Sequence, residues 1–326
     1  MNNLTDWQQL MVEANDEVDA QEKQALDKIK STAPTIDSGA MLVGLNISVW
    51  EGRKLDKRAS EDVTNANHAK KHSAVVHKSL MADCEYLKAI KSHRGVVRNH
   101  VHYKLTLPWI HNGPALLTTQ AFFQYKPLMD EAQNTFWAMV GEFLANYQMA
   151  VAQAQVALGD LFDPNEYPHP DDLKHKFKFE VDYIPLPSSG DFRLDMGNEQ
   201  ADYLSEQYEK FYAEKFTAAM RDIWERLMEP LANMVDRLDY ANKETKKIFK
   251  DSLVSNVLAV VDLMGVANVS DDPNMRRIEN ELRQALEGID PSALREDAGL
   301  RAATHKVAAQ ALRDTKQQID ALPSIW

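Results

Sequence analysis

Residues 204–238 read LSEQYEKFYAEKFTAAMRDIWERLMEPLANMVDRL, a run whose pattern indicates the main helix of the protein. Its apolar side chains recur every three or four residues, which is typical of one face of an α-helix. The same spacing extends over about 198–264 and includes Leu204, Tyr208, Phe211, Ala219, Ile223, Leu227, Leu231, Val235, Leu238, Ile248 and Leu253. Because proline lacks an amide hydrogen, we expect Pro230 to kink or divide this helix.

A second long helix is predicted over 127–161, with Pro127 in its first turn. The two long helices flank a proline-punctuated insertion, residues 162–195. Two long helices joined by one insertion favour an antiparallel hairpin with the insertion at its tip.

Shorter elements follow from local patterns. Residues 40–50 alternate apolar and polar side chains and predict a strand, and Phe177, Phe179 and Val181 predict a short edge strand. Further helices are expected over 2–31, 74–103 and 300–322. Two more helix starts are indicated where an aspartate precedes a proline, at Asp272-Pro273 and Asp290-Pro291.

Composition agrees with this helical pattern, because only 12 of the 326 residues are glycine, well below the usual share. We therefore predict a mainly α protein, an elongated helical bundle with a long antiparallel helical hairpin and a small β element. The expected regions are 1–120, with helices, the strand and a basic segment, 121–265, with the hairpin, and 266–326, with C-terminal helices.

Three features bear on compartment. The single cysteine, Cys84, leaves no internal disulfide and lies in an apolar stripe, so we expect it to be buried. The first residues lack the pattern of a signal peptide. The most apolar long window, 253–269, contains polar residues and is too short to span a membrane. These observations favour a cytoplasmic protein without a membrane span.

No motif in the sequence indicates catalysis. The glycine-rich phosphate-binding signatures and the nucleophile elbow are absent, so we expect no enzyme activity, no catalytic residue and no cofactor. His68 and His72 have the spacing that places two metal ligands on one helix face. Lys70 and Lys71 lie between them and oppose a cation, so no metal site is predicted.

Charge is unevenly distributed. The net charge is −12, yet residues 51–104 carry twelve basic and six acidic residues. Such a segment either docks on an acidic surface of this chain or of a neighbouring subunit, or contacts nucleic-acid phosphates. The residues that would serve nucleic acid are Arg53, Lys54, Lys57, Arg58, Lys70 and Lys71.

Two groups of residues are candidates for binding a protein partner. In the run WEGRK, Gly52 permits a tight turn after Trp50, and Arg53 and Lys54 reach outward. In the insertion, aromatic side chains either anchor the tip or bind a partner. The aromatic candidates are Tyr167, Phe177, Phe179 and Phe192.

The run LNISVWEGRKL at 45–55 resembles the opening of a family of uncharacterised phage and mobile-element proteins that carry a Trp-x-Gly-Arg-Lys-type motif. FLANY at 143–147 and FKFEVDYIPLP at 177–187 are similar to later parts of that family. Members are often encoded near a MoxR-type AAA+ ATPase and a von Willebrand A-domain protein. The resemblance implies an adaptor, substrate or assembly component of such an ATPase system and supplies no catalytic residues.

We therefore expect a non-enzymatic scaffold, adaptor or self-assembling structural protein, a homo-oligomer that acts with a protein partner. The resemblance implies that this partner is the ATPase. The alternative is a nucleic-acid-binding protein that uses residues 53–104.

Overall fold

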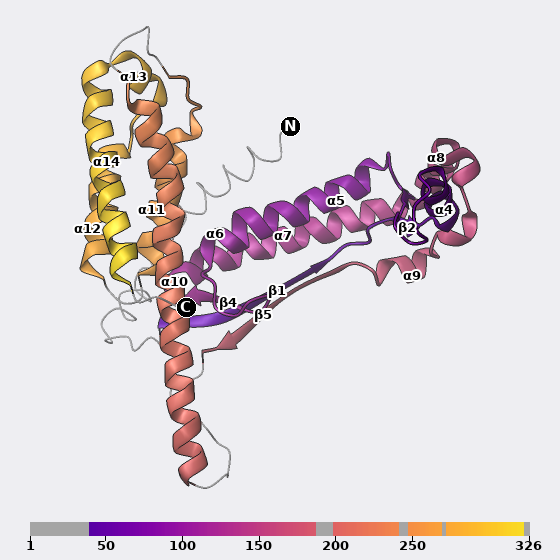
Figure 1. Cartoon of the computed structure of the whole chain (residues 1–326), viewed down its shortest axis with the longest axis horizontal. Helices are drawn as coiled ribbons and strands as arrows, with labels where there is room; N and C mark the ends of the chain where they lie inside the picture. The colour runs from indigo at the N-terminus through magenta and orange to yellow at the C-terminus, as the bar shows by residue number, and fades with distance from the viewer. Residues whose placement is uncertain (1–38, 187–197, 241–246, 269–271, 323–326) are drawn as a thin grey trace. The chain divides into compact units, whose positions relative to one another are not determined.

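The computed structural model describes residues 39–186, 198–240, 247–268 and 272–322 (Figure 1). These residues are mostly helical and include a small antiparallel sheet, as predicted. The elongated bundle and the long hairpin are not confirmed. The predicted helix over 2–31 and the candidate Phe192 lie outside the described residues.

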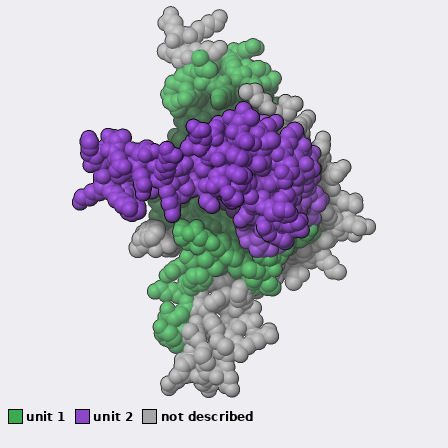
Figure 2. Space-filling view, turned by 90° about the vertical axis from the view of Figure 1, so that its right-hand side faces the viewer, with its two compact units in different colours: residues 1–44, 103–126, 182–326 green, residues 45–102, 127–181 purple. Residues whose placement is uncertain are grey.

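The chain forms two compact units, each assembled from separate stretches of sequence (Figure 2). Unit 1 comprises residues 1–44, 103–126 and 182–326, and unit 2 comprises 45–102 and 127–181. Three of the four boundaries between these stretches fall within single elements, namely β1 (Ala40–Ser48), α7 (Thr119–Ala145) and β5 (Lys178–Pro185).

Unit 1 is built mainly from helices that run alongside one another (Figure 1). Its elements are α6 (Tyr103–Leu105), β4 (Ala115–Thr118), α10 (Asn198–Leu238), α11 (Ser252–Ala267), α12 (Pro273–Leu286), α13 (Pro291–Glu296) and α14 (Ala298–Ala321). The long helix α10 packs on α14 and α11, and α12 packs on both α11 and α14.

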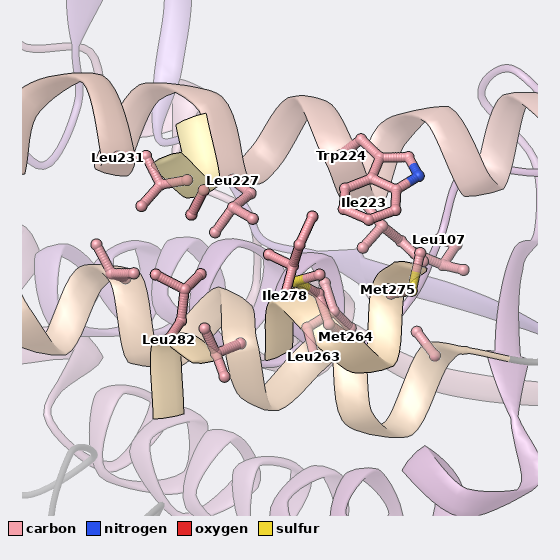
Figure 3. Close-up of a cluster of buried hydrophobic side chains, with 14 of the residues drawn as sticks. Leu107, Ile223, Trp224, Leu227, Leu231, Leu263, Met264, Met275, Ile278 and Leu282 are labelled. Atoms are coloured by element: carbon pink, nitrogen blue, oxygen red, sulfur yellow. The ribbon is translucent and has the colours of Figure 1, made fainter. Parts of the chain in front are cut away.

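The core of unit 1 lies between these helices. Trp224 and Leu227 of α10 face Met264 of α11 and Ile278 of α12 in Figure 3, and all four side chains are buried. Burial of such side chains is the main driving force for this packing. The apolar spacing of residues 219–238 therefore marks the helix face on which unit 1 assembles.

Aspartates begin three of the unit 1 helices. The side chains of Asp272 and Asp290 accept a backbone hydrogen bond two residues later, and proline occupies the first helical position in each case. Both predicted helix starts are confirmed. Asp297 caps α14 in the same way, which fits the predicted helix over 300–322.

The larger sheet has the order β4-β1-β5. Strand β1 pairs antiparallel with β4, with Ala40 opposite Thr118 and Val43 opposite Ala115. The strands expected at 40–50 and at Phe177–Val181 are both present, as β1 and β5.

Unit 2 contains a pair of helices, α5 and α7, that lie side by side (Figure 1). The buried His93 of α5 joins them, because its Nε2 donates to the carbonyl oxygen of Ala132 at 2.8 Å. The other elements of unit 2 are β2 (Arg53–Leu55), α4 (Lys57–Ala66), β3 (His77–Ser79), α5 (Glu85–Val96), the π-helix Val97–His102, α8 (Tyr147–Leu158), two 3₁₀ turns (Gly159–Leu161 and Pro164–Glu166) and α9 (Pro170–Lys174).

The helix predicted over 74–103 is wrong in its first part. Residues 77–79 form β3, which pairs with β2 at residues 53–55, and the helix starts only at Glu85. Cys84 is buried, as expected, at the residue before that helix.

 Strands β2 and β3 are neighbours in space, although the ten-residue helix α4 and the turn after it separate them in sequence. A pattern within 74–84 does not reveal this pairing, because the strand partner lies outside that window.

Two boundaries of the long helices also differ from the prediction. Helix α7 begins at Thr119 and contains Pro127 in its interior, because the hydroxyl of Thr118 accepts from the amide of Ala121 and starts the helix earlier. Helix α10 ends at Leu238 and also contains its proline, Pro230, in its interior, so that proline does not divide it. The chain then reverses, and α11 packs back on α10.

Candidate functional site

Residues 53–79 of unit 2 form a small lobe that consists of β2, α4, a turn and β3 (Figure 1). We call it the basic lobe. Its two strands pair antiparallel, with Arg53 opposite Ser79 and Leu55 opposite His77. The lobe carries seven basic and three acidic residues in a chain whose net charge is −12. It contains every residue that the sequence assigned to nucleic-acid binding.

A short hydrogen-bond network fixes α4 to the segment before β3. The side chain of Asp56 accepts from the amide of Ala59 at 2.9 Å and caps the helix, while the Asp56 amide donates to the carbonyl of Val76. The hydroxyl of Ser60 accepts from the Val76 amide at 2.9 Å and donates to the Asp56 carbonyl. Since these bonds satisfy backbone groups at both ends of the lobe, they define its shape.

Gly52 makes the turn that leads into β2. Its φ is +57°, in the left-handed region that favours glycine, and its carbonyl accepts from the amide of Leu80 at 2.7 Å. A Cβ at this position would lie 3.1 Å from Cδ2 of Leu87. The tight turn expected of the WEGRK run is therefore present.

Six cations of the basic lobe are exposed and make no ion pair with a described carboxylate: Arg53, Lys54, Lys57, Arg58, Lys70 and Lys71. Basic residues further along the chain behave differently. Lys78 pairs with Glu166 at 2.7 Å, and Lys91 and Arg94 both pair with Glu51. Docking on carboxylates of this chain thus accounts for part of the basic segment and leaves these six side chains facing solvent.

The paired cations shift the pKa values of nearby acids. Partial burial raises the pKa of Glu51, but hydrogen bonds from Arg94 and Lys91 outweigh it, so the pKa lies below its ordinary value. Hydrogen bonds from Asn165 lower the pKa of Asp163, and the charges of Lys78 and Lys54 lower it further. Lys54 therefore acts on an acidic neighbour from beyond ion-pair distance.

The basic lobe has an open hollow of about 610 Å³ at its surface. One face of α4 lines it with Lys57, Ser60, Glu61, Thr64 and Asn65. The rest of the lining is partly apolar and comes from the end of β2 and the segment after α4. These residues are Leu55, Ala69, Lys71, His72, Ala74 and Val75. A hollow of this volume is in the range of ligand-binding pockets.

Two apolar side chains in this hollow are unusually accessible. Leu55 is 43% exposed and Val75 is 62% exposed. Sequence reasoning missed both residues, because they are twenty positions apart and only the folded lobe brings them to one hollow. The available signal was a leucine and a valine within an otherwise charged segment.

The histidine pair does not have the geometry expected from its spacing. Helix α4 ends at Ala66, so His68 and His72 lie in the following turn, with φ values of 48° and 71°. Residues other than glycine adopt this region rarely, histidine more readily than most. Among the described residues, no group of three or more His, Cys, Asp or Glu is arranged to hold a metal.

The predicted partner-binding aromatics mostly form part of the interior of unit 2. Phe177 and Phe179 are buried against Phe143 and Phe136, with ring centroids 5.8 and 5.4 Å apart. The partly exposed Trp50 packs edge-on against Tyr147 at 6.2 Å.

Tyr167 is half-buried, and its hydroxyl donates to the carbonyl of Leu80 at 3.0 Å. Together with Phe177 and Phe179, it packs within unit 2. The structure therefore separates the two candidate sets, since the cations lie at the surface and the aromatics pack inside.

No family model matches this chain, and no curated protein or solved structure matches it. None of the described helices combines the length and apolarity needed to cross a membrane.

Proposed function

We propose that this chain is a non-enzymatic nucleic-acid-binding protein that contacts phosphates through the basic lobe. The observation that carries the proposal is a set of six exposed cations that make no ion pair with any carboxylate in the described part of the chain: Arg53, Lys54, Lys57, Arg58, Lys70 and Lys71. Lysine and arginine bind nucleic acid by displacing the counterions that surround its phosphates.

The placement of two of these cations supports a role outside folding. Lys57 and Arg58 lie in the first turn of α4, which contains no acidic residue. The helix dipole disfavours positive charge at this end, so these side chains oppose the stability of their own helix. Lys54 also lies directly opposite Lys78 in the strand pair, another unfavourable arrangement of like charges.

Binding rather than catalysis is part of the same proposal, since the sequence carries no nucleotide-hydrolysis or nucleophile-elbow motif. An adaptor role beside a MoxR-type AAA+ ATPase and a bacterial host rest on the family resemblance alone, whereas a cytoplasmic location is proposed from the single cysteine and the N-terminal sequence pattern. The elongated bundle with a long hairpin likewise remains a prediction.

The test measures binding of a labelled single strand of about 20 nucleotides by fluorescence anisotropy at low salt. We expect the variant Arg53→Gln/Lys54→Gln/Lys57→Gln/Arg58→Gln to lose at least about ten-fold in affinity. The matched control is Lys210→Gln/Lys306→Gln/Arg313→Gln/Lys316→Gln, which removes four exposed charges from unit 1. Equal affinities of the two variants would contradict the proposal, as would equally tight binding of polyglutamate.

Self-association is a second candidate function, favoured by the exposed side of α8. Its twelve residues include no acidic or basic side chain. Met149 is 51% exposed and Val156 is 86% exposed. Such a helix face packs against a copy of itself without burying a charge. Light scattering at micromolar concentration should then show an oligomer that Val156→Glu converts to a monomer, and a monomeric parent protein would exclude this role.

A further inference from the structure

The hollow of the basic lobe differs from the cationic surface around it. A surface that only contacts phosphates needs positive charge, but this hollow also presents Leu55 and Val75 to solvent. Exposed apolar side chains grouped in a concave site are typical of ligand-binding positions. The phosphate contacts proposed above leave these two side chains unexplained.

The lining contains three kinds of group. Leu55, Ala74 and Val75 supply an apolar wall, and the accessible ring of His72 lies beside them. Lys57 and Lys71 supply positive charge. Glu61 and Asn65 offer an acceptor and an amide from α4. A ligand that fits these lining groups has a flat apolar ring with polar edges, and it carries phosphates on either side of that ring.

We infer that this hollow receives an unpaired base of a single-stranded nucleic acid, with the flanking phosphates near Lys57 and Lys71. The inference rests on the proposed function, because the strand is held by the same cations. Bases of single strands are free to turn out of a stack and pack against side chains in a pocket, whereas paired bases stay inside the duplex.

A free mononucleotide would share this chemistry but would not use the whole lobe. Arg53, Lys54, Arg58 and Lys70 do not line the hollow, yet they are exposed on the same lobe. A ligand with several phosphates engages these additional cations. A strand supplies phosphates on both sides of the bound base. The observations therefore favour a strand.

The experiment compares four probes by anisotropy or competition at one low salt concentration. These are a single strand of about 12 nucleotides, an abasic strand with the same number of phosphates, a matched duplex, and adenosine monophosphate as competitor. The abasic strand preserves the phosphate contacts and removes the bases. We expect the base-bearing strand to bind at least about ten-fold more tightly than the abasic strand.

The variant Leu55→Ser/Val75→Ser makes the hollow polar without changing its charge. We expect it to bind the base-bearing strand as weakly as the abasic strand, with unchanged affinity for the abasic strand. Val63→Ser is the matched control, because Val63 is 43% exposed on α4 of the same lobe and does not line the hollow. Because all three side chains are substantially exposed, thermal melts should coincide with that of the parent protein.

Three results would overturn the inference. They are equal affinity for the abasic and base-bearing strands, binding of the duplex at least as tightly as of the single strand, and displacement of the strand by adenosine monophosphate at a concentration close to the strand's own Kd. Each of these three results would still require that the lobe binds phosphates, so the proposed function would stand. Absence of salt-dependent binding to every polymer would instead remove both.

Discussion

The helices of unit 1 and the basic lobe of unit 2 differ in the ion pairing of their charged side chains and in the burial of their apolar side chains. In unit 1, Arg277 bonds to Glu281 and Asp314 at 2.9 and 2.7 Å, and Trp224 is 1% exposed. In the basic lobe, six exposed cations make no ion pair with a described carboxylate, and Val75 is largely exposed. Arg277 and Trp224 thus find their partners within unit 1, whereas the six cations and Val75 of the lobe are open to a ligand.

The largest expected effect is a loss of stability caused by a substitution in the interior of unit 1. Trp224→Ala should lower the free energy of unfolding of unit 1 by about 3–5 kcal/mol, because it removes a fully buried aromatic side chain and leaves a cavity (Figure 3). Hydrogen exchange in α10 and α12 measures this loss locally. Val63→Ser in the basic lobe is the control and should change stability by less than about 0.5 kcal/mol. Similar losses in both variants would mean that the two regions do not differ as described.

The next effect concerns the stability of the basic lobe and the turn at Gly52 that leads into β2. Gly52→Ala should destabilise the lobe by about 1–2 kcal/mol, because its φ of +57° disfavours a side chain and the added Cβ would crowd Leu87. Gly95→Ala is the matched control: its position in α5 is helical and has no neighbour within 4 Å of a new Cβ. That control should be neutral or stabilising, since alanine favours helices. Exchange rates in β2 and β3 distinguish the two outcomes.

A pH effect is expected from the buried His93 of unit 2. Burial lowers its pKa below the ordinary 6.5, although the hydrogen bond to the Ala132 carbonyl opposes this shift. The unfolded chain then binds a proton more readily than the folded one. The free energy of unfolding should therefore fall as the pH drops below about 6.5.

Urea unfolding at several pH values measures this dependence. His93→Gln should reduce it, while the control His68→Gln, in an exposed turn, should leave it unchanged. A dependence that persists in full in the His93→Gln variant would assign it to other groups.

The smallest effect compares single charges in the two regions. Arg277→Gln should cost about 0.5–1 kcal/mol, because it removes two ion pairs on the surface of unit 1. Lys57→Gln should raise stability slightly, by less than about 0.5 kcal/mol, because it removes a positive charge from the first turn of α4. Denaturant midpoints of the two variants give the comparison, and a clear loss for Lys57→Gln would indicate an ion pair in solution.

Local signals predicted the parts of the fold that depend on local interactions. Asp272 and Asp290 cap helices because an aspartate and a proline suffice to start one, and α14 follows its apolar spacing. The pairing of β2 with β3 and the reversal after Leu238 depend on contacts between distant residues. A sequence window does not contain that information.

The same distinction applies to the candidate site. Arg53, Lys54, Lys57 and Arg58 were identified from charge alone, because long exposed cations need no particular partner to stay at the surface. The aromatic candidates Phe177 and Phe179 are buried, since their alternating pattern marks a strand face that packs inside unit 2. Leu55 and Val75 meet only in the folded lobe.

The most direct test of the central claim is the salt dependence of single-strand binding. Log affinity should fall linearly with log salt concentration for the parent protein, with a slope of about −0.7 for each phosphate contacted. Neutralising Arg53, Lys54, Lys57 and Arg58 should make this slope shallower by about 3, and the matched unit 1 variant should retain the parent slope. An unchanged slope in the lobe variant, or equal changes in both, would contradict the account.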